Sequence, residues 1–135
     1  MRAGDLMRTE LVTFHENDPI DEVLDVLVEQ HIHGAPVVDD GGCLVGVISQ
    51  LDIHFGRMSR EQPNGPDSGR LLARDVMTSP PVSATEDTDV VELCQLMYRL
   101  RIHRVPIVRG SRIAGIVSSL DVCQAIASGR VTFAG

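Results

Sequence analysis

The sequence predicts an α/β (α+β) protein made of two copies of one βαββα unit. The first observation is a duplication: residues 5–38 match residues 75–108 at a constant offset of 70, and the match continues after the next turn at an offset of 69. The second is that apolar residues recur at helical spacing in each copy. The third is that two short β-rich runs follow each of these helices. An internal duplication of a mixed unit accounts for all three.

The first long helix of each copy is predicted from apolar residues at i, i+3, i+4, i+7 and i+8, one face of an amphipathic helix. In the first copy these are Ile20, Val23, Leu24, Leu27 and Val28. In the second copy they are Val90, Leu93, Cys94, Met97 and Tyr98. Asp18 is predicted as the N-cap before Pro19, and Thr88 as the equivalent cap.

Two β-rich runs after each helix are predicted to form a hairpin. APVVD and CLVGVIS flank a DGG turn, and VPIVR and RIAGIVS flank a Gly-Ser turn. A second helix then begins at SQLDIHF or SSLDVCQAIA. One copy of about 55 residues is too small to be comfortably stable alone. We therefore expect the copies to pack sheet to sheet about a pseudo-twofold axis, with clefts between them.

The chain divides into three predicted parts. Residues 1–59 form the first repeat, residues 60–69 a linker, and residues 70–135 the second repeat. The linker is predicted because that stretch contains Pro, Gly, Asn and Ser with little periodicity.

Composition narrows the class of protein. The chain has 135 residues, of which 43% are apolar and 23% charged, as in globular proteins. It has no apolar run near the roughly 20 residues of a membrane span, no signal peptide and three scattered cysteines, so we expect a cytoplasmic protein without a membrane partner. A net charge of −7 and 3% aromatic residues argue against a nucleic-acid partner.

Charge is distributed unevenly between the copies. Residues 1–56 carry 11 acidic residues against two arginines, whereas residues 75–135 carry six of each. The chain has no lysine, so every basic side chain is a guanidinium, the better bidentate partner for phosphate or carboxylate. An anionic ligand is therefore expected to prefer the second copy.

Each second helix begins with the pattern G-h-h-S-x-x-D, as GVISQLDI and GIVSSLDV. One interpretation is structural: Ser at the N-cap and Asp three residues later form a capping box worth about 1 kcal/mol. The other is that the hydroxyl and the carboxylate hold a ligand. The residues alone leave both open.

These motifs resemble the CBS domain, named after cystathionine β-synthase. The similarity is carried by IHGAPVVD, by the two G-h-h-S-x-x-D segments and by their tandem order, and it covers residues 5–56 and 75–128. It implies a Bateman module, here a stand-alone CBS-domain protein. Such modules bind adenosine-containing ligands in the clefts between the repeats. AMP, ADP or ATP is expected, with S-adenosylmethionine or NAD as further candidates and no required cofactor.

The resemblance also assigns site residues. Ser118 and Asp121 would face the ribose at one site, and Ser49 and Asp52 at the other, because an ionised carboxylate offers two acceptor oxygens to a diol. Adenine would lie against apolar side chains of the opposite repeat, which by position would include Val23 and Ile32 at one site, or Leu93 and Ile102 at the other.

Residues just before the central proline would approach the phosphates. These are His103 and Arg104 in the second copy, but His33 and Gly34 in the first. Because the first copy lacks this arginine and lies in the acidic half, we expect the Asp121 site to be the better nucleotide site.

Other functions are weaker predictions. His31 and His33 could suggest a metal, but two histidines without further clustered ligands are a poor site, and none is predicted. No catalytic motif is present, so an enzyme is not expected. The alternative to a ligand-sensing regulatory module is a structural or protein-interaction module that acts through dimerisation. In either case a homodimer is expected, and the regulated protein is unknown.

Overall fold

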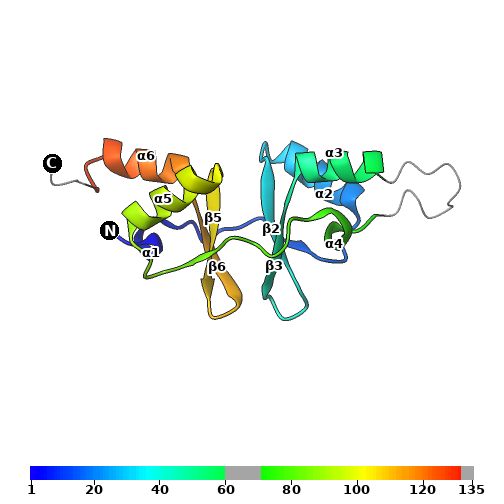
Figure 1. Ribbon diagram of the computed structural model, residues 1–135, viewed down its shortest axis with the longest axis horizontal. Helices are drawn as coiled ribbons and strands as arrows, with labels where there is room; N and C mark the ends of the chain where they lie inside the picture. The colour runs from blue at the N-terminus through cyan, green and yellow to red at the C-terminus, as the bar shows by residue number, and fades with distance from the viewer. Residues whose placement is uncertain (60–70, 132–135) are drawn as a thin grey trace, which may run out of the picture. The chain divides into compact units, whose positions relative to one another are not determined.

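The computed structural model describes residues 1–59 and 71–131 and divides the chain into two compact units, which we describe separately. Unit 1 comprises residues 1–11 and 82–135, and unit 2 comprises residues 12–81. The predicted linker, residues 60–69, lies outside the described residues. Each unit holds a three-stranded sheet and helices, which confirms the mixed α/β fold class (Figure 1). No helix in the described residues is long and apolar enough to cross a bilayer.

Unit 2 carries the sheet of the first repeat, in the order β1-β2-β3. Strand β1 is parallel to β2, and β2 and β3 form the predicted antiparallel hairpin. The elements of unit 2 are β1 (Phe14–His15), α2 (Ile20–Glu29), β2 (Gly34–Val38), β3 (Leu44–Ser49), α3 (Gln50–Ser59) and α4 (Ala73–Val76).

Unit 1 repeats this arrangement with the sheet β4-β5-β6, again with one parallel and one antiparallel pair. Its elements are α1 (Ala3–Leu6), β4 (Ala84–Thr85), α5 (Val90–Leu100), β5 (Arg104–Arg109), β6 (Arg112–Ser118) and α6 (Ser119–Ala127). Both predicted long helices and both predicted hairpins are therefore present at their expected places. The short helices α1 and α4 were not predicted.

The short helices exchange places relative to the sequence repeats. Helix α1 stands at the start of the first repeat, yet it packs against β4, β6 and α6 of the second repeat (Figure 1). The amide of Ala3 donates to the carbonyl of Thr88 at 2.8 Å. Helix α4 packs in the same way against α3 and β3, and the amide of Ala73 donates to the carbonyl of Asp18 at 2.8 Å. Residues 1–11 are thereby brought to the second Ser/Asp motif.

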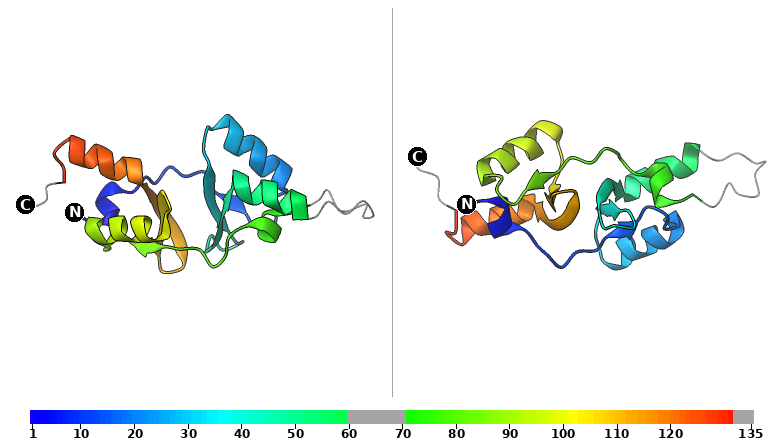
Figure 2. Two further views of the ribbon diagram at one scale, coloured as in Figure 1. Left: turned by 45° about the horizontal axis from the view of Figure 1, so that its top comes forward. Right: turned by 90° about the horizontal axis from the view of Figure 1, so that it is seen from below.

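Each unit has its own apolar core between the sheet and the two longer helices, which lie on the same side of it (Figure 2). In unit 2, Val23 and Leu27 of α2 meet Val37 and Ile48 of the sheet, and all four are fully buried. Such burial contributes about 1.5–3 kcal/mol for each large side chain. This packing holds the beginning of α3 at the end of β3; α6 is held on β6 in the same way.

The predicted caps of α2 and α5 are wrong by one residue. Helix α2 has Pro19 at its N-cap with no side-chain capping bond, and the N-cap of α5 is Asp89, whose carboxylate accepts from the amide of Val91 at 2.9 Å. Asp18 and Thr88 instead accept hydrogen bonds from the amides at the ends of β1 and β4. Their side chains close the turns that precede the helices.

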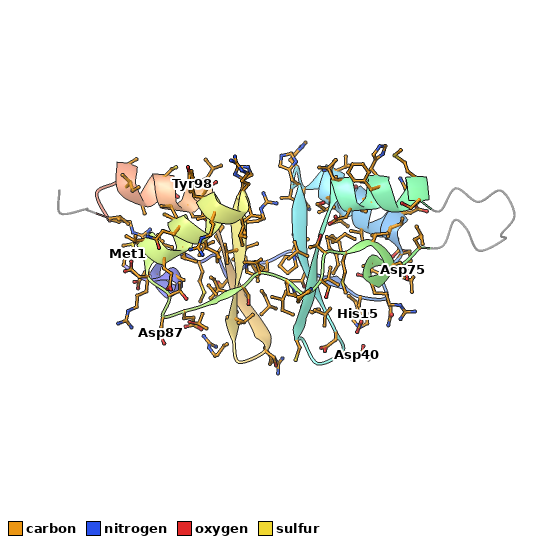
Figure 3. All side chains as sticks on the ribbon, in the orientation of Figure 1. Met1, His15, Asp40, Asp75, Asp87 and Tyr98 are labelled. Carbon is orange, nitrogen blue, oxygen red and sulfur yellow. The ribbon has the colours of Figure 1, made fainter. Side chains whose placement is uncertain are left out.

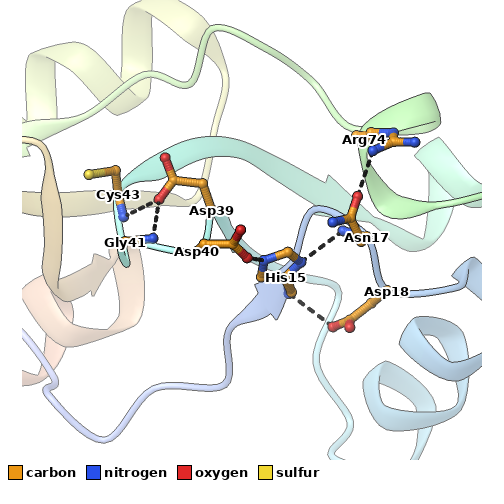
Figure 4. A network of polar contacts seen from close by, with 8 residues as sticks. All are labelled: His15, Asn17, Asp18, Asp39, Asp40, Gly41, Cys43 and Arg74. Carbon is orange, nitrogen blue, oxygen red and sulfur yellow. Dashed lines mark hydrogen bonds and ion pairs between the residues drawn. The ribbon is translucent and has the colours of Figure 1, made fainter.

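A polar network fastens β1 to its surroundings in unit 2 (Figure 4). His15 contacts Asp40 in the hairpin turn through Nε2 and accepts from the amide of Asn17 through Nδ1. Asn17 accepts in turn from Arg74 of α4 at 2.6 Å. The network therefore joins the turn between β2 and β3, strand β1 and the exchanged helix α4.

Candidate functional site

The second Ser/Asp motif forms a complete capping box at the start of α6. The amide of Asp121 donates to Ser118 Oγ at 3.2 Å, and the amide of Ser118 donates to Asp121 Oδ2 at 2.8 Å. Two helix-start amides are satisfied by these reciprocal bonds. The structural interpretation of the motif is therefore confirmed here, and the ribose contact stays a prediction.

The first motif has the same geometry at the start of α3. The amide of Asp52 donates to Ser49 Oγ at 3.1 Å, and the amide of Ser49 donates to Asp52 Oδ2 at 2.9 Å. In both copies one carboxylate oxygen, Oδ2, serves the helix. The other, Oδ1, is left for a different partner, and there the two copies differ.

The residues expected to approach a phosphate lie beside these boxes. Arg104 is the register partner of Ser118 across the β5–β6 pair, and the carbonyl of His103 accepts from the amide of Ser119 at 2.8 Å. The His103 side chain is exposed and that of Arg104 half-buried. The structure thus brings His103 and Arg104 to the helix start that carries Ser118 and Asp121.

The first copy places His33 and Gly34 in the equivalent position, with Gly34 opposite Ser49. His33 is exposed, and its carbonyl accepts from the amide of Gln50 at 3.0 Å. A Cβ atom at residue 34 would lie 2.8 Å from the carbonyl oxygen of Ile48, a backbone atom with little freedom to move. The local approach of β2 to β3 therefore accounts for the absence of an arginine there.

The glycine of each G-h-h-S-x-x-D motif admits a second segment against the strand. A Cβ atom on Gly115 would lie 2.6 Å from Met7 Sδ and 2.9 Å from the carbonyl oxygen of Arg8. Gly46 stands in the same relation to Met77 and Thr78, at 2.5 Å and 3.0 Å. These glycines let the residues that follow α1 and α4 lie directly on β6 and β3.

Arg8 is the partner of Asp121 that the sequence did not reveal. Its Nε donates to Asp121 Oδ1 at 2.8 Å, and Asp121 is only 6% exposed, whereas the Arg8 side chain is 66% exposed. The two residues are 113 positions apart. The alignment of Met7 with Met77 marks residues 8 and 78 as equivalent positions, but no sequence signal places either beside a G-h-h-S-x-x-D strand.

Asp52 has a weaker partner at the same place. Thr78 Oγ1 lies 3.4 Å from Asp52 Oδ1, at the limit of hydrogen-bond distance, and Asp52 is half-buried. Asp52 also lines a hollow of about 240 Å³ between α3 and α4, together with Phe55, Gly56 and Asp75 among others. This hollow is smaller than the roughly 300–1,000 Å³ typical of ligand pockets. Asp75, which lines this hollow from α4, is labelled in Figure 3.

The four apolar residues assigned to adenine separate into two classes. Val23 and Leu93 are fully buried in the two cores, so neither has surface with which a ligand could make contact in this conformation. Ile32 and Ile102 are partly buried and precede the His-Gly and His-Arg pairs. Ile32 and Ile102 therefore remain the candidates for contact with the base.

His31 and His33 do not gather further ligands. Within residues 1–59 and 71–131, no group of three or more His, Cys, Asp or Glu side chains could hold a metal ion. Each unit thus carries one capping carboxylate at a helix start, and in unit 1 an arginine on β5 and a second arginine from the N-terminal segment lie beside it.

The chain matches a known protein family and is similar to solved structures. The family model of the CBS domain matches residues 3–55 and 73–128. The chain is similar to the solved structure of CBSX2 in complex with AMP, with a TM-score of 0.84 and 27% identity over 96% of this chain and 98% of that one. It is also similar to the CBS domain pair of protein MJ0100 in complex with 5′-methylthioadenosine and S-adenosyl-L-methionine, with a TM-score of 0.79 and 27% identity over 96% and 98%.

Sequence relatives have varied lengths. Inosine-5′-monophosphate dehydrogenase of Methanocaldococcus jannaschii is 30% identical over 124 residues, which are 91% of this chain and 23% of that enzyme. YlbB of Bacillus subtilis is 30% identical over 122 residues, which are 90% of this chain and 79% of that protein. The chain therefore spans about a quarter of the dehydrogenase, and the two share a module rather than a whole protein.

Proposed function

Because the chain belongs to the CBS domain family, we propose that it is a regulatory module that binds an adenosine-containing ligand. AMP, ADP and ATP are the first candidates, and S-adenosylmethionine and NAD are further ones. The observation that carries the proposal is the repeated Ser/Asp box, with Arg104 beside the second copy. Two similar domain pairs, each matched over 96% of this chain, hold AMP or other adenosine compounds, which supports the same ligand class here.

In the proposed complex, Asp121 accepts from the ribose hydroxyls, and Ser118 supports it through the capping box. His103 and Arg104 approach the phosphates. A carboxylate has about four lone-pair positions, and the amide of Ser118 occupies one of them on Oδ2. Helix capping and ligand binding are therefore compatible at Asp121.

The Asp52 site is proposed as the weaker one for a nucleotide. It has His33 and Gly34 in place of His103 and Arg104. Helix α2 places Asp21, Glu22 and two further acids in the same unit. Negative charge of this density opposes a phosphate and favours a less charged ligand.

A homodimer is part of the proposal, and one feature supports it. On α3, Leu51, Phe55 and Met58 are 64%, 59% and 59% exposed and fall at i, i+4 and i+7, one face of the helix. A second copy of the chain is the proposed occupant of this face. If no ligand binds, association through this face is the alternative function, that of a structural or protein-interaction module.

We further propose that the module has no catalytic activity of its own, acts in the cytoplasm and regulates another protein. Three free cysteines support an intracellular location, because disulfides are rare in that compartment. The dehydrogenase relative, of which this chain covers 23%, supports a regulatory rather than a catalytic part.

Thermal unfolding tests the ligand proposal. A ligand that binds only the folded chain increases the free energy of unfolding with the logarithm of its concentration over its dissociation constant, by about 2.7 kcal/mol at 100-fold excess, and so raises the midpoint. We expect AMP, ADP or ATP to raise the midpoint more than guanosine monophosphate, the control. No shift with these ligands, S-adenosylmethionine or NAD would favour the interaction module.

A further inference from the structure

Residues 8 and 78 hold equivalent backbone positions but carry different side chains. Arg8 and Ile116 exchange two backbone hydrogen bonds, at 2.9 and 3.0 Å, as Thr78 and Val47 do at 2.9 and 3.1 Å. The motif glycine lies beside each bridge and admits the segment. The backbone therefore delivers residue 8 to Asp121 and residue 78 to Asp52 in the same way.

The side chains give the two carboxylates different partners. Arg8 makes a charge-assisted bond to Asp121 Oδ1 at 2.8 Å, whereas Thr78 offers a neutral hydroxyl to Asp52 Oδ1 at 3.4 Å. Charge-assisted bonds are roughly twice as strong as neutral ones. Asp121 is left 6% exposed, while Asp52 is half-buried. A ligand that engages Asp121 must therefore share the carboxylate with Arg8 or displace it.

We propose that Arg8 is a specificity-determining residue, which makes the Asp121 site select phosphate-bearing adenosine ligands over uncharged nucleosides. This inference rests on the proposed function of that site. When the ribose hydroxyls displace Arg8 from Asp121, the phosphate of the ligand gives the guanidinium a new anionic partner. An uncharged nucleoside breaks the same ion pair and offers no replacement.

Exposure is consistent with this exchange of partners. The Arg8 side chain is 66% exposed, so it can turn outward without unpacking a core. The carboxylate, by contrast, is fixed by the amide of Ser118 at 2.8 Å and stays in place. At the Asp52 site, the hydroxyl of Thr78 sets no such requirement, so that site does not distinguish the two ligand classes in this way.

Calorimetric titration of AMP and adenosine into the full chain tests the inference. The quantity measured is the ratio of the adenosine to the AMP dissociation constant. The main variant is Arg8→Thr, which copies the residue found at the equivalent position 78, and Arg8→Gln is a second variant that keeps a neutral donor. Arg2→Thr is the matched control, because it removes one arginine from the same segment, and the partner of Arg2 is Asp87 rather than Asp121.

We expect the ratio to fall by about tenfold in both Arg8 variants, the effect of one charge-assisted bond, and to stay unchanged in Arg2→Thr. If AMP and adenosine both bind and the ratio is the same in wild type and both Arg8 variants, the role of Arg8 is overturned while the proposed function stands. An equal fall in Arg2→Thr would also overturn it, because overall charge would then explain the effect. If neither AMP nor adenosine binds the wild-type chain, the role of Arg8 is overturned, and the proposed function fails as well only if ADP, ATP, S-adenosylmethionine and NAD also do not bind.

Discussion

At the scale of single residues, the two copies of the motif differ in the partners of their aspartates. Asp121 and Asp52 each give Oδ2 to a helix-start amide. At Oδ1, however, Asp121 meets the guanidinium of Arg8 and Asp52 meets the hydroxyl of Thr78. One duplicated motif therefore presents a buried, ion-paired carboxylate in one unit and a more accessible one in the other.

The capping role of Ser118 can be measured without any ligand. Ser118→Ala removes the acceptor for the amide of Asp121, and we expect a loss of about 1 kcal/mol in the free energy of unfolding. The control is Ser119→Ala, which leaves the box intact and keeps the backbone bond to His103. Urea titration compares the two, and equal midpoints would show that the box does not stabilise α6.

The family resemblance assigned the Ser/Asp pairs and the neighbouring His103 and Arg104, and the structure brings His103 and Arg104 to Ser118 and Asp121. The sequence could not predict Arg8. Local patterns reach only a few residues, and the partners are 113 positions apart. Val23 and Leu93 fit the apolar face of their helices, but that same face is what the core buries, so an apolar residue there is not evidence of a ligand contact.

At the scale of helices and strands, the packing of α1 explains why Arg8 reaches Asp121. Helix α1 begins the first repeat and packs on the second, and the segment after it bridges to β6 at Ile116. Gly115 makes room for that segment. A repeat alignment assigns residues 1–11 to the first copy, and periodicity carries no information about which sheet they contact.

The close approach at Gly115 gives a second prediction. Gly115→Ala places a methyl group 2.6 Å from Met7 Sδ and 2.9 Å from a backbone oxygen, so we expect a loss of about 1–3 kcal/mol in the free energy of unfolding. Gly41→Ala is the control, because the nearest atom to its Cβ would be 3.5 Å away. Urea unfolding that gives both variants the same midpoint would contradict this account of the motif glycine.

Cys94 of α5 supplies a prediction that depends on pH. Burial raises the pKa of its thiol, and Cys123 and Asp89 add to the rise. Since the folded chain holds this proton more tightly, the resulting stabilisation is present below the pKa of the unfolded thiol and is lost as the pH rises through that of the folded thiol.

Alkylation by iodoacetamide, followed by mass spectrometry, measures this effect. At about pH 8, we expect Cys94 to react more slowly in the folded chain than in urea, because less thiolate is present. The difference should narrow as the pH is raised further. Equal rates in folded and unfolded protein near pH 8 would be inconsistent with a raised pKa.

At the scale of the whole molecule, both the fold class and the family could be predicted from the internal duplication. The alignment of two copies turned two weak motifs into one strong pattern, which is why the βαββα units and the CBS family could be predicted. Association between chains has no comparable sequence signal. The exposed apolar face of α3, in which Phe55 is 59% exposed, is what supports the proposed homodimer.

Sedimentation velocity tests the proposed homodimer. Phe55→Asp puts a charge on the apolar face of α3, and we expect the dimer to weaken by at least about tenfold. Gln124→Asp is the matched control, because residue 124 holds the equivalent position on α6 and the same charge is added there. If wild-type protein is monomeric, or if only the control variant dissociates, α3 is not the interface.

Calorimetric titration of AMP into wild-type protein, Asp121→Asn and Asp52→Asn tests the central claim most directly. Asparagine keeps one side-chain oxygen for the capping box but loses the carboxylate that would accept from the ribose diol. We expect AMP to bind the wild type. Asp121→Asn should weaken AMP binding by about tenfold or more, and Asp52→Asn should weaken it by less. A larger loss from Asp52→Asn, or AMP binding that neither substitution alters, would contradict the assignment of the nucleotide to Ser118 and Asp121.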